Sequence, residues 1–405
     1  MNNLDFKFWS PTEAQAPKHY REDNSVLVLH CDGAPYCYGK WIAKTTIKTG
    51  ATYVATVECR IESCPTHEDN HAYAMINWRD ENGKYIQREH LMSSNLPENH
   101  HEWLTLTCTS EAPEGATEAE LELTLSAPGK VKWRNATIIE TTKAPTRPVK
   151  IASAFFTPRY DLQQNLETML TLADQAGKQK ADILLFTESA YDRGITPIQA
   201  KCIPVPSASP DDPLGRLGTK AKEHNLNILV NIVECENGFF FNSTVLLDRN
   251  GQYKGKYHKS HLPPVEKEAG FSPGNTLPIL ETDFATIGIM TCFDLAFIDI
   301  GHTLREKGAE IIFVPTIGNF MLYSQILAKE AGRYIVVSGG DKPHPSRIIN
   351  PNGDIIASVD GTADGIAFTE IDLSKSFYSM ALGFYPAKSN AHNALHNQRR
   401  QHLYT

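Results

Sequence analysis

Three residues that could do chemistry together follow the ends of three predicted strands. Cys292 comes two residues after a short apolar run at 287–290 and begins a Cys-Phe-Asp sequence, which predicts a thiol on a strand-to-loop turn. Glu188 closes the apolar run DILLFTES, and Lys259 lies in KYHKSHL, shortly after the run FNSTVLLD. These positions are far apart in the chain, so only a folded sheet could bring the thiol, the carboxylate and the amine together.

This trio suits nucleophilic attack on a carbonyl carbon. A thiol has a free pKa of about 8.5, so it needs a base within hydrogen-bond reach at neutral pH. Glu188 is the candidate base, and we expect a partly dry pocket to raise its pKa, so that it can take the thiol proton and return it to the departing nitrogen. Lys259 and the backbone N–H of Phe293 could stabilise the oxyanion. Departure of the nitrogen would leave the acyl group on Cys292 as a thioester. Water activated by Glu188 would then hydrolyse this thioester, so we expect no metal or organic cofactor.

Taken alone, two of these residues also fit structural roles. A free cysteine is most often a buried small hydrophobe, and a lysine is commonly a solvated surface residue. The surrounding sequence favours the chemical interpretation, because it resembles the carbon–nitrogen hydrolase (nitrilase) superfamily from about residue 149 to the C-terminus. The resemblance rests on LLFTES, on Lys-Ser-His-Leu at 259–262 and on Cys-Phe-Asp at 292–294, with weaker similarities in GAEIIFVPT, AKEAGRYIVVSG, SRIINPNGDIIAS and RRQHLY.

The resemblance also implies a second glutamate after the lysine. The segment PVEKEAGFSPG offers two, Glu266 and Glu268. The register of Gly270 and of the turn at 272–274 favours Glu266, which would hold Lys259 and the substrate nitrogen by hydrogen bonding. The implied catalytic set is Glu188 as base and acid, Lys259 as oxyanion stabiliser, Cys292 as nucleophile, and Glu266.

The substrate is expected to be a small molecule. Cys-Phe-Asp resembles the amidase and carbamoylase branches of the superfamily more than the Cys-Trp-Glu of true nitrilases, which favours an amide or N-carbamoyl substrate. The alternatives are a nitrilase that acts on a nitrile and a catalytically inactive sugar-binding or scaffold protein. The loops at 189–196, 316–323 and 341–346 are expected to line the pocket. The candidate substrate-binding residues are Phe293, Asn319, Arg193 and Glu268, although Arg193 and Asn319 are as consistent with ordinary loop residues.

The second part of the chain alternates strands with helices. VKIASAFF, DILLFTE, NILVNIVE and STVLLD are typical of strands, and LQQNLETMLTLADQAGKQ and PLGRLGTKAKEHN are typical of helices. The alternation by itself predicts one parallel sheet covered by helices on both faces. The resemblance instead implies a nitrilase-like α+β fold, a four-layer αββα sandwich in which two sheets pack face to face, and this is the fold that we predict.

The first third of the chain differs from the rest in composition and pattern. All five tryptophans lie there, and period-two strands alternate with turn sequences over residues 40–140. This pattern predicts an all-β sandwich and resembles the jelly-roll modules often found in carbohydrate-binding proteins. Its tryptophans are expected to fill a core or face the other domain more often than to stack on sugar. The Pro-containing, basic segment 141–150 predicts a linker, which gives domains at 1–143 and 144–405.

Composition excludes several other classes of partner. The 405 residues carry a formal net charge of −8, which gives no basic footprint for nucleic acid or for an anionic membrane. The sequence MNNLDFKFWS lacks the pattern of a signal peptide, and no apolar run reaches the roughly 18 residues of a spanning helix. We therefore expect a cytoplasmic protein. We also expect it to form a homodimer or a larger homo-oligomer. Eight irregularly spaced cysteines without a CxxC pair predict free thiols and argue against a zinc site.

Overall fold

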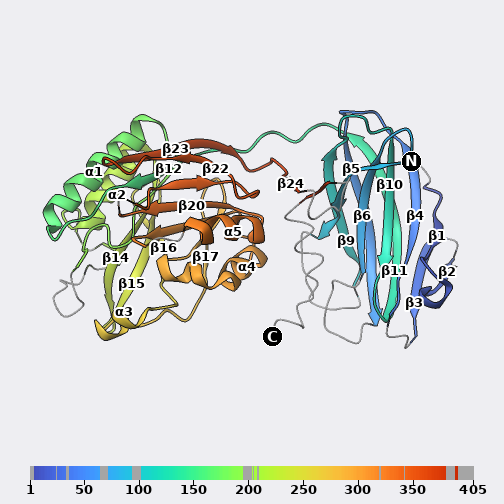
Figure 1. Ribbon diagram of the computed structural model, residues 1–405, viewed down its shortest axis with the longest axis horizontal. Helices are drawn as coiled ribbons and strands as arrows, with labels where there is room; N and C mark the ends of the chain where they lie inside the picture. The colour runs from blue at the N-terminus through green and yellow to red at the C-terminus, as the bar shows by residue number, and fades with distance from the viewer. Residues whose placement is uncertain are drawn as a thin grey trace. The chain divides into compact units, whose positions relative to one another are not determined.

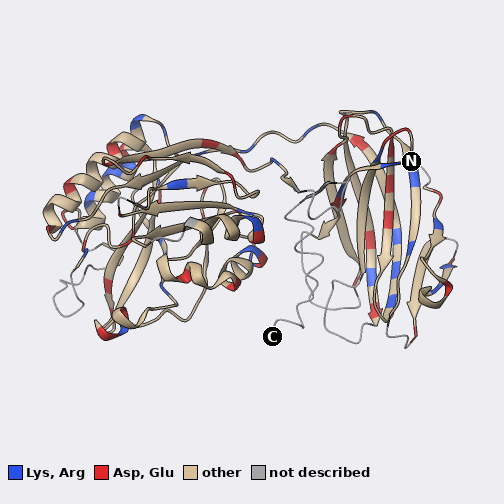
Figure 2. Ribbon diagram, viewed as in Figure 1, with Lys and Arg blue, Asp and Glu red and all other residues tan. Residues whose placement is uncertain are grey.

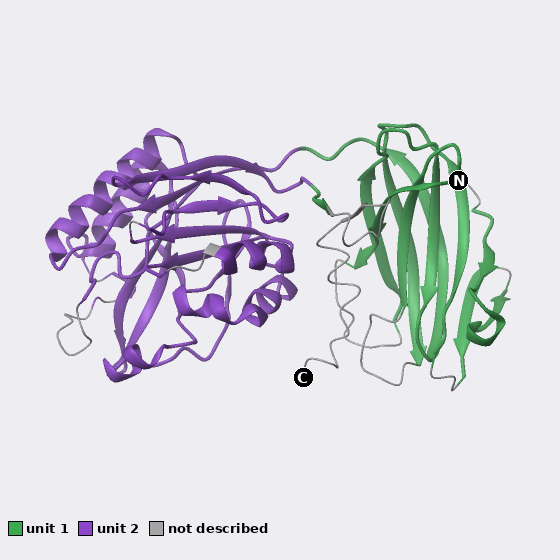
Figure 3. Ribbon diagram, viewed as in Figure 1, with its two compact units in different colours: residues 1–145, 376–405 green, residues 146–375 purple. Residues whose placement is uncertain are grey.

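The chain forms two compact units in the computed structural model (Figure 3). One unit contains residues 1–145 and 376–405, and the other contains residues 146–375. No helix in the part of the chain that the structure describes is long and apolar enough to cross a membrane. The described residues are 4–23, 25–32, 36–63, 72–93, 102–194, 203, 205–207, 209–318, 321–341, 343–379 and 388–390.

The first unit is rich in strands that form two sheets (Figure 1), largely antiparallel. One sheet has the order β1 (Lys7–Trp9), β4 (Gly39–Thr46), β10 (Glu118–Leu125), β6 (Ala72–Arg79), β7 (Tyr85–His90), β25 (Lys388–Asn390) and β24 (Tyr378–Ser379). The other has the order β2 (Lys18–Glu22), β3 (Val26–Cys31), β11 (Gly129–Thr141), β5 (Thr52–Ser63), β9 (Leu104–Glu111) and β8 (Met92–Ser93). A short 3₁₀ turn, η1 (Glu13–Gln15), precedes β2.

The period-two pattern of these strands separates a core from a charged face. Trp41, Trp78 and Trp133 are buried in the hydrophobic core, as expected for most of the tryptophans, whereas Trp9 is 44% exposed. On the other face of β10, glutamates pair with basic residues of neighbouring strands, and Figure 2 shows red and blue segments on the strands of this unit. These cross-strand pairs neutralise carboxylates that are largely buried. They are Lys40–Glu122, Lys44–Glu118 and Arg79–Glu120.

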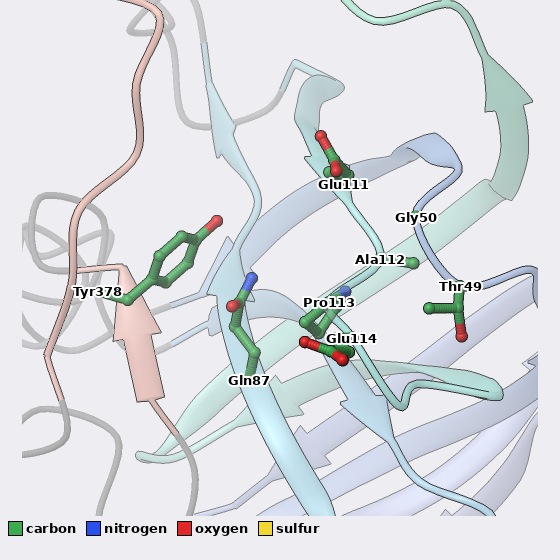
Figure 4. A pocket seen from close by; sticks show the side chains of 8 residues that line it. All are labelled: Thr49, Gly50, Gln87, Glu111, Ala112, Pro113, Glu114 and Tyr378. Atoms are coloured by element: carbon green, nitrogen blue, oxygen red, sulfur yellow. The ribbon is translucent and has the colours of Figure 1, made fainter.

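The first unit also contains strands from the far end of the chain. β25 pairs in parallel with β7, and β24 pairs with β25. The Tyr378 hydroxyl donates a hydrogen bond to Glu89 Oε1 at 2.5 Å, and burial raises the pKa of Glu89. Tyr378 also lines a cavity of about 280 Å³ together with Gln87, Glu111 and Glu114 (Figure 4). The residues after 375 are thus grouped with the first unit, although the closing RRQHLY lies outside the described residues.

The second unit contains two six-stranded sheets. One has the order β16 (Tyr253–His258), β15 (Phe239–Leu247), β14 (Asn227–Glu236), β13 (Ile183–Leu185), β12 (Pro148–Phe155) and β23 (Gly365–Asp372). The other has the order β17 (Ile279–Glu281), β18 (Thr286–Ile289), β19 (Ile311–Thr316), β20 (Tyr334–Gly339), β21 (Arg347–Ile349) and β22 (Ile355–Ser358). The chain therefore builds two sheets here, and not the one sheet that the alternating pattern alone predicted.

The sheets of the second unit meet through β12 and β20, where Ser153 Oγ donates to the Val337 carbonyl at 2.8 Å. The central strand pairs of both sheets are parallel, which explains their continuous apolar runs. Helices α1 (Leu162–Lys178) and α2 (Pro213–His224) pack on each other and on the first sheet, and α4 (Ile298–Glu306) and α5 (Met321–Ala331) pack on each other, with α5 also contacting the second sheet. The shorter elements are α3 (Pro264–Glu268) and η3 (Cys292–Ala296).

Candidate active site

The structure brings the four residues of the predicted catalytic set together. Lys259 Nζ lies 2.9 Å from Glu188 Oε1 and 2.5 Å from Glu266 Oε1. Cys292 lies close enough to Glu188 and Lys259 for the charges of both to shift the pKa of its thiol. Glu188 and Lys259 are only 2% and 1% exposed, so water does not screen their charges, and the ion pairs are stronger than they would be at the surface.

Both sheets of the second unit supply this cluster. Glu188 follows β13, and Lys259 follows β16 of the same sheet, whereas Cys292 follows β18 of the other sheet. Cys292 is the first residue of η3 and has a φ of 48°, a left-handed backbone conformation that residues other than glycine seldom adopt. Such strain is typical of a nucleophile held on a sharp turn after a strand.

Asp294 ties the nucleophile turn to the lysine segment. Its Oδ2 accepts from Thr291 N at 2.9 Å and from the Tyr257 hydroxyl at 2.7 Å. Its Oδ1 accepts from His261 N at 3.0 Å and from Ser260 Oγ at 3.2 Å. Because Asp294 is fully buried, losing these donors would leave an unpaired carboxylate in a dry site. The residue thus fixes the positions of both Cys292 and Lys259, a role that the sequence pattern alone did not indicate.

The pKa of Glu188 shifts in the direction opposite to the one predicted from the sequence. Burial by itself raises the pKa of this carboxyl, but the charge of Lys259 and hydrogen bonds from Lys259, Cys292 and Asn242 lower it below its ordinary value. The expected rise in pKa is therefore wrong. The physical reason is that a neighbouring ammonium and several donors favour the carboxylate more than desolvation disfavours it.

Burial and the neighbouring charges also shift the pKa values of the other three groups. Burial raises the pKa of Cys292 to about 12, and the charge of Glu188 adds to this rise while Lys259 opposes it. Burial would lower the pKa of Lys259, but Glu188, Cys292 and Glu266 together raise it. Burial also raises the pKa of Glu266 despite the nearby Lys259. The resting site thus holds a neutral thiol beside an ionised carboxylate. A base in this state can remove the thiol proton and so generate a thiolate.

The predicted substrate-binding residues lie in different environments. Phe293 is partly buried and meets Phe297 edge-on, with ring centroids 5.5 Å apart. Arg193 Nη1 donates to the Gly340 carbonyl at 3.2 Å. Glu268 is exposed on α3, whereas Glu266 on the same helix contacts Lys259. Asn319 lies outside the described residues.

Sequence reasoning missed two asparagines behind the base. Asn242 Nδ2 donates to Glu188 Oε1 at 2.9 Å, and Asn231 Nδ2 donates to Asn242 Oδ1 at 2.7 Å. On the other side, the backbone N–H of Ile317 donates to Glu188 Oε2 at 3.3 Å. The signal was present, because NILVNIVE and FFFNSTVLL each place an amide within a strand rich in apolar residues, where a buried polar group needs a partner.

Within the described residues, two clusters outside this site have metal-ligand residue types. Asp174, Glu223 and His224 form one cluster, and Glu234, Glu236 and His258 form the other. Each already holds a lysine ammonium: Lys220 lies 2.7 Å from Asp174, and Lys256 lies 2.5 Å from Glu234. Neither cluster includes a member of the predicted catalytic set.

Comparison with known proteins indicates the family of the second part of the chain. A family model described as carbon-nitrogen hydrolase matches residues 150–376. The chain is similar to the probable nitrilase C965.09 of Schizosaccharomyces pombe, with 26% identity over 53% of this chain and 84% of that protein. It is also similar to the N-carbamoylputrescine amidase of Arabidopsis thaliana, with 26% identity over 57% of this chain and 89% of that protein. In fold it matches an amidase from Nesterenkonia sp. with a TM-score of 0.53, at 20% identity over 65% of this chain and 97% of that one.

Proposed function

The chain belongs to the carbon-nitrogen hydrolase family, and on that premise we propose that it hydrolyses a small amide or N-carbamoyl compound through a thioester on Cys292. The observation that carries the proposal is the buried contact of Lys259 with Glu188 and Glu266 beside the thiol. The relatives described above include an amidase that acts on a carbamoyl compound, which supports this substrate class.

The first half of the reaction forms the thioester. Glu188 takes the thiol proton as sulfur attacks the carbonyl carbon, and the carbonyl electron pair moves onto oxygen. Lys259 and the backbone N–H of Phe293 stabilise this oxyanion. Glu188 then gives its proton to the leaving nitrogen, the C–N bond breaks, and the oxyanion collapses to the thioester. The lowered pKa of Glu188 suits the step in which it acts as a base, because the group starts ionised.

The second half of the reaction releases the acid. Glu188 takes a proton from water while the water oxygen attacks the thioester carbon, and a second oxyanion forms at the same donors. Its collapse breaks the C–S bond, and the thiolate recovers a proton from Glu188. Glu266 moves no proton in this scheme. It accepts a hydrogen bond from Lys259 and so keeps the ammonium in place, with its free oxygen available to hold the substrate nitrogen.

Of two alternatives, one uses the same residues on a different substrate and the other does not use them. A nitrile substrate would form a thioimidate on Cys292 before its nitrogen leaves as ammonia. An inactive sugar-binding or scaffold protein would need none of these groups. The buried lysine between two carboxylates weighs against the second alternative, because burying three charged groups costs free energy that a scaffold gains nothing from.

Release of ammonia or amine across a panel of small amides, N-carbamoyl amines and nitriles tests the proposal. We expect turnover with at least one amide or N-carbamoyl compound, and a carbamoyl substrate would also yield carbon dioxide. Turnover confined to nitriles would support the nitrilase alternative. No turnover of any compound by folded wild-type protein, with an unmodified Cys292, would contradict the proposal.

The fold and assembly of the protein have finer features that we also propose. The two sheets and outer helices of the second unit suit a four-layer αββα sandwich, and the first unit suits a jelly roll that binds sugar or mediates assembly. We propose a cytoplasmic homodimer or larger homo-oligomer. Domains of 1–143 and 144–405 remain our prediction from the sequence, whereas the grouping of residues 376–405 with the first unit makes 146–375 the better fragment to express.

A fragment of residues 146–375 is expected to retain turnover when it is soluble. All four members of the proposed catalytic set, and the contacts among them, lie within this unit. The measurement is kcat/KM of the fragment and of the full chain with one substrate. A folded fragment with a reactive Cys292 but no turnover would show that the first unit is required for catalysis.

A further inference from the structure

Two buried asparagines on neighbouring strands lie behind Glu188. Asn231 on β14 is 1% exposed, and Asn242 on β15 is 5% exposed. Asn231 has apolar neighbours on both sides in β14, and Asn242 lies between Phe241 and Ser243 in β15. A primary amide in such a place destabilises the fold unless its hydrogen-bonding groups are satisfied, so the partners of these two amides indicate why they are there.

The partners form a chain of hydrogen bonds that runs in one direction. Ser189 N donates to Asn231 Oδ1 at 2.7 Å, and Asn231 Nδ2 donates to Asn242 Oδ1 at 2.7 Å. Asn242 Nδ2 then donates to Glu188 Oε1 at 2.9 Å. A backbone N–H can only donate, so the oxygen of Asn231 must face Ser189. This fixes the orientation of the first amide, and the first amide fixes that of the second, which must present its NH₂ to Glu188.

The chain makes the two oxygens of Glu188 unequal. Oε1 accepts from both Asn242 Nδ2 and Lys259 Nζ, each at 2.9 Å, which occupies both of its lone pairs. Oε2 accepts from the Ile317 N–H at 3.3 Å and keeps a lone pair for another donor. Because Oε2 is the oxygen with a lone pair to spare, it is the one that can exchange a proton with the nearby thiol of Cys292.

We propose that Asn231 and Asn242 are positioning residues that form an amide relay: they keep Glu188 Oε1 as a permanent acceptor and leave Oε2 to carry the catalytic proton. The inference rests on the proposed role of Glu188 as base. Neither asparagine touches sulfur or substrate in this proposal. Their effect passes through the orientation and charge of Glu188.

Two isosteric variants test the relay. Asn242→Asp replaces the last donor with a second carboxylate, so it should raise the pKa of Glu188. Asn231→Asp does not touch Glu188, but its oxygen would face Asn242 Oδ1 and force that amide to turn its own oxygen toward Glu188. Both variants should therefore move the acidic limb of kcat/KM upward by about one pH unit or more, with a smaller change in KM.

Asn227→Asp is the matched control. Asn227 lies on the same face of β14, is 2% exposed, and donates to the Asp182 carbonyl and to Asp283 Oδ1, so this variant also disturbs buried hydrogen bonds. It should lower the unfolding midpoint without moving the acidic limb. An unchanged acidic limb in either folded relay variant, with only a loss of stability like that of the control, would overturn the relay.

A readout without substrate separates this inference from the proposed function. The rate of alkylation of Cys292 by iodoacetamide, followed by mass spectrometry of its peptide, reports removal of the thiol proton at each pH. We expect the midpoint of this profile to shift upward in both relay variants and to stay constant in Asn227→Asp. If wild-type protein hydrolyses nothing, the proposed function fails while the alkylation profiles still decide the relay. Identical profiles in all folded variants would overturn the relay even if the enzyme is active.

Discussion

Replacing Cys292 with alanine is expected to reduce turnover by about 10⁴-fold or more, because no other group in the site can form the thioester. The alanine side chain occupies less space than the thiol, and it meets the same left-handed φ that the cysteine already adopts. Unfolding midpoint and circular dichroism should therefore stay close to those of the wild type. The measurement is kcat/KM with whichever amide or carbamoyl compound the wild type uses.

Two further observations sharpen this test. Mass spectrometry during turnover should show an acyl adduct on the peptide that carries Cys292, most visibly in Glu188→Gln, because loss of the base slows hydrolysis of the thioester. EDTA should leave wild-type turnover unchanged. Substantial activity in Cys292→Ala, or activity lost with EDTA and restored by zinc, would contradict the mechanism.

Replacing Glu266 with glutamine is expected to lower turnover by roughly 10²-fold or more, as for removal of other positioned groups beside a developing oxyanion. The change preserves shape but removes a negative charge 2.5 Å from Lys259 Nζ. Lys259 would then keep its ion pair with Glu188 alone. Its ammonium would move, and both the base Glu188 and the oxyanion donor Lys259 would be misplaced. The loss should appear in kcat more than in KM.

Glu268→Gln is the matched control on the same short helix. Glu268 is exposed, so its neutralisation should change turnover only a few-fold, because solvent screens a charge at the surface. Both variants are measured with one substrate. A severe loss in Glu268→Gln together with a mild one in Glu266→Gln would show that the wrong glutamate was assigned.

Much of the architecture could be predicted because local patterns encode it. The spacing of apolar residues predicted helices where α1 and α2 lie, and period-two alternation predicted strands where β5, β6, β9, β10 and β11 lie. The number of sheets in the second unit could not be read from such patterns, since a buried strand has the same apolar run in either sheet. Only the family resemblance indicated two sheets. The return of β24 and β25 to the first unit had no local signal, because two- and three-residue strands carry almost no periodicity.

The sequence by itself determined which groups we propose for the chemistry: residue type, motif order and the family resemblance were enough to select Cys292, Glu188 and Lys259, and the register of Gly270 was enough to prefer Glu266. Only the tertiary structure decided their ionisation. A pKa depends on distances between charges and on burial, so the lowered pKa of Glu188 and the raised pKa of Cys292 required the folded site. The same holds for Asn231 and Asn242, since hydrogen bonds across strands depend on a register that the sequence does not state.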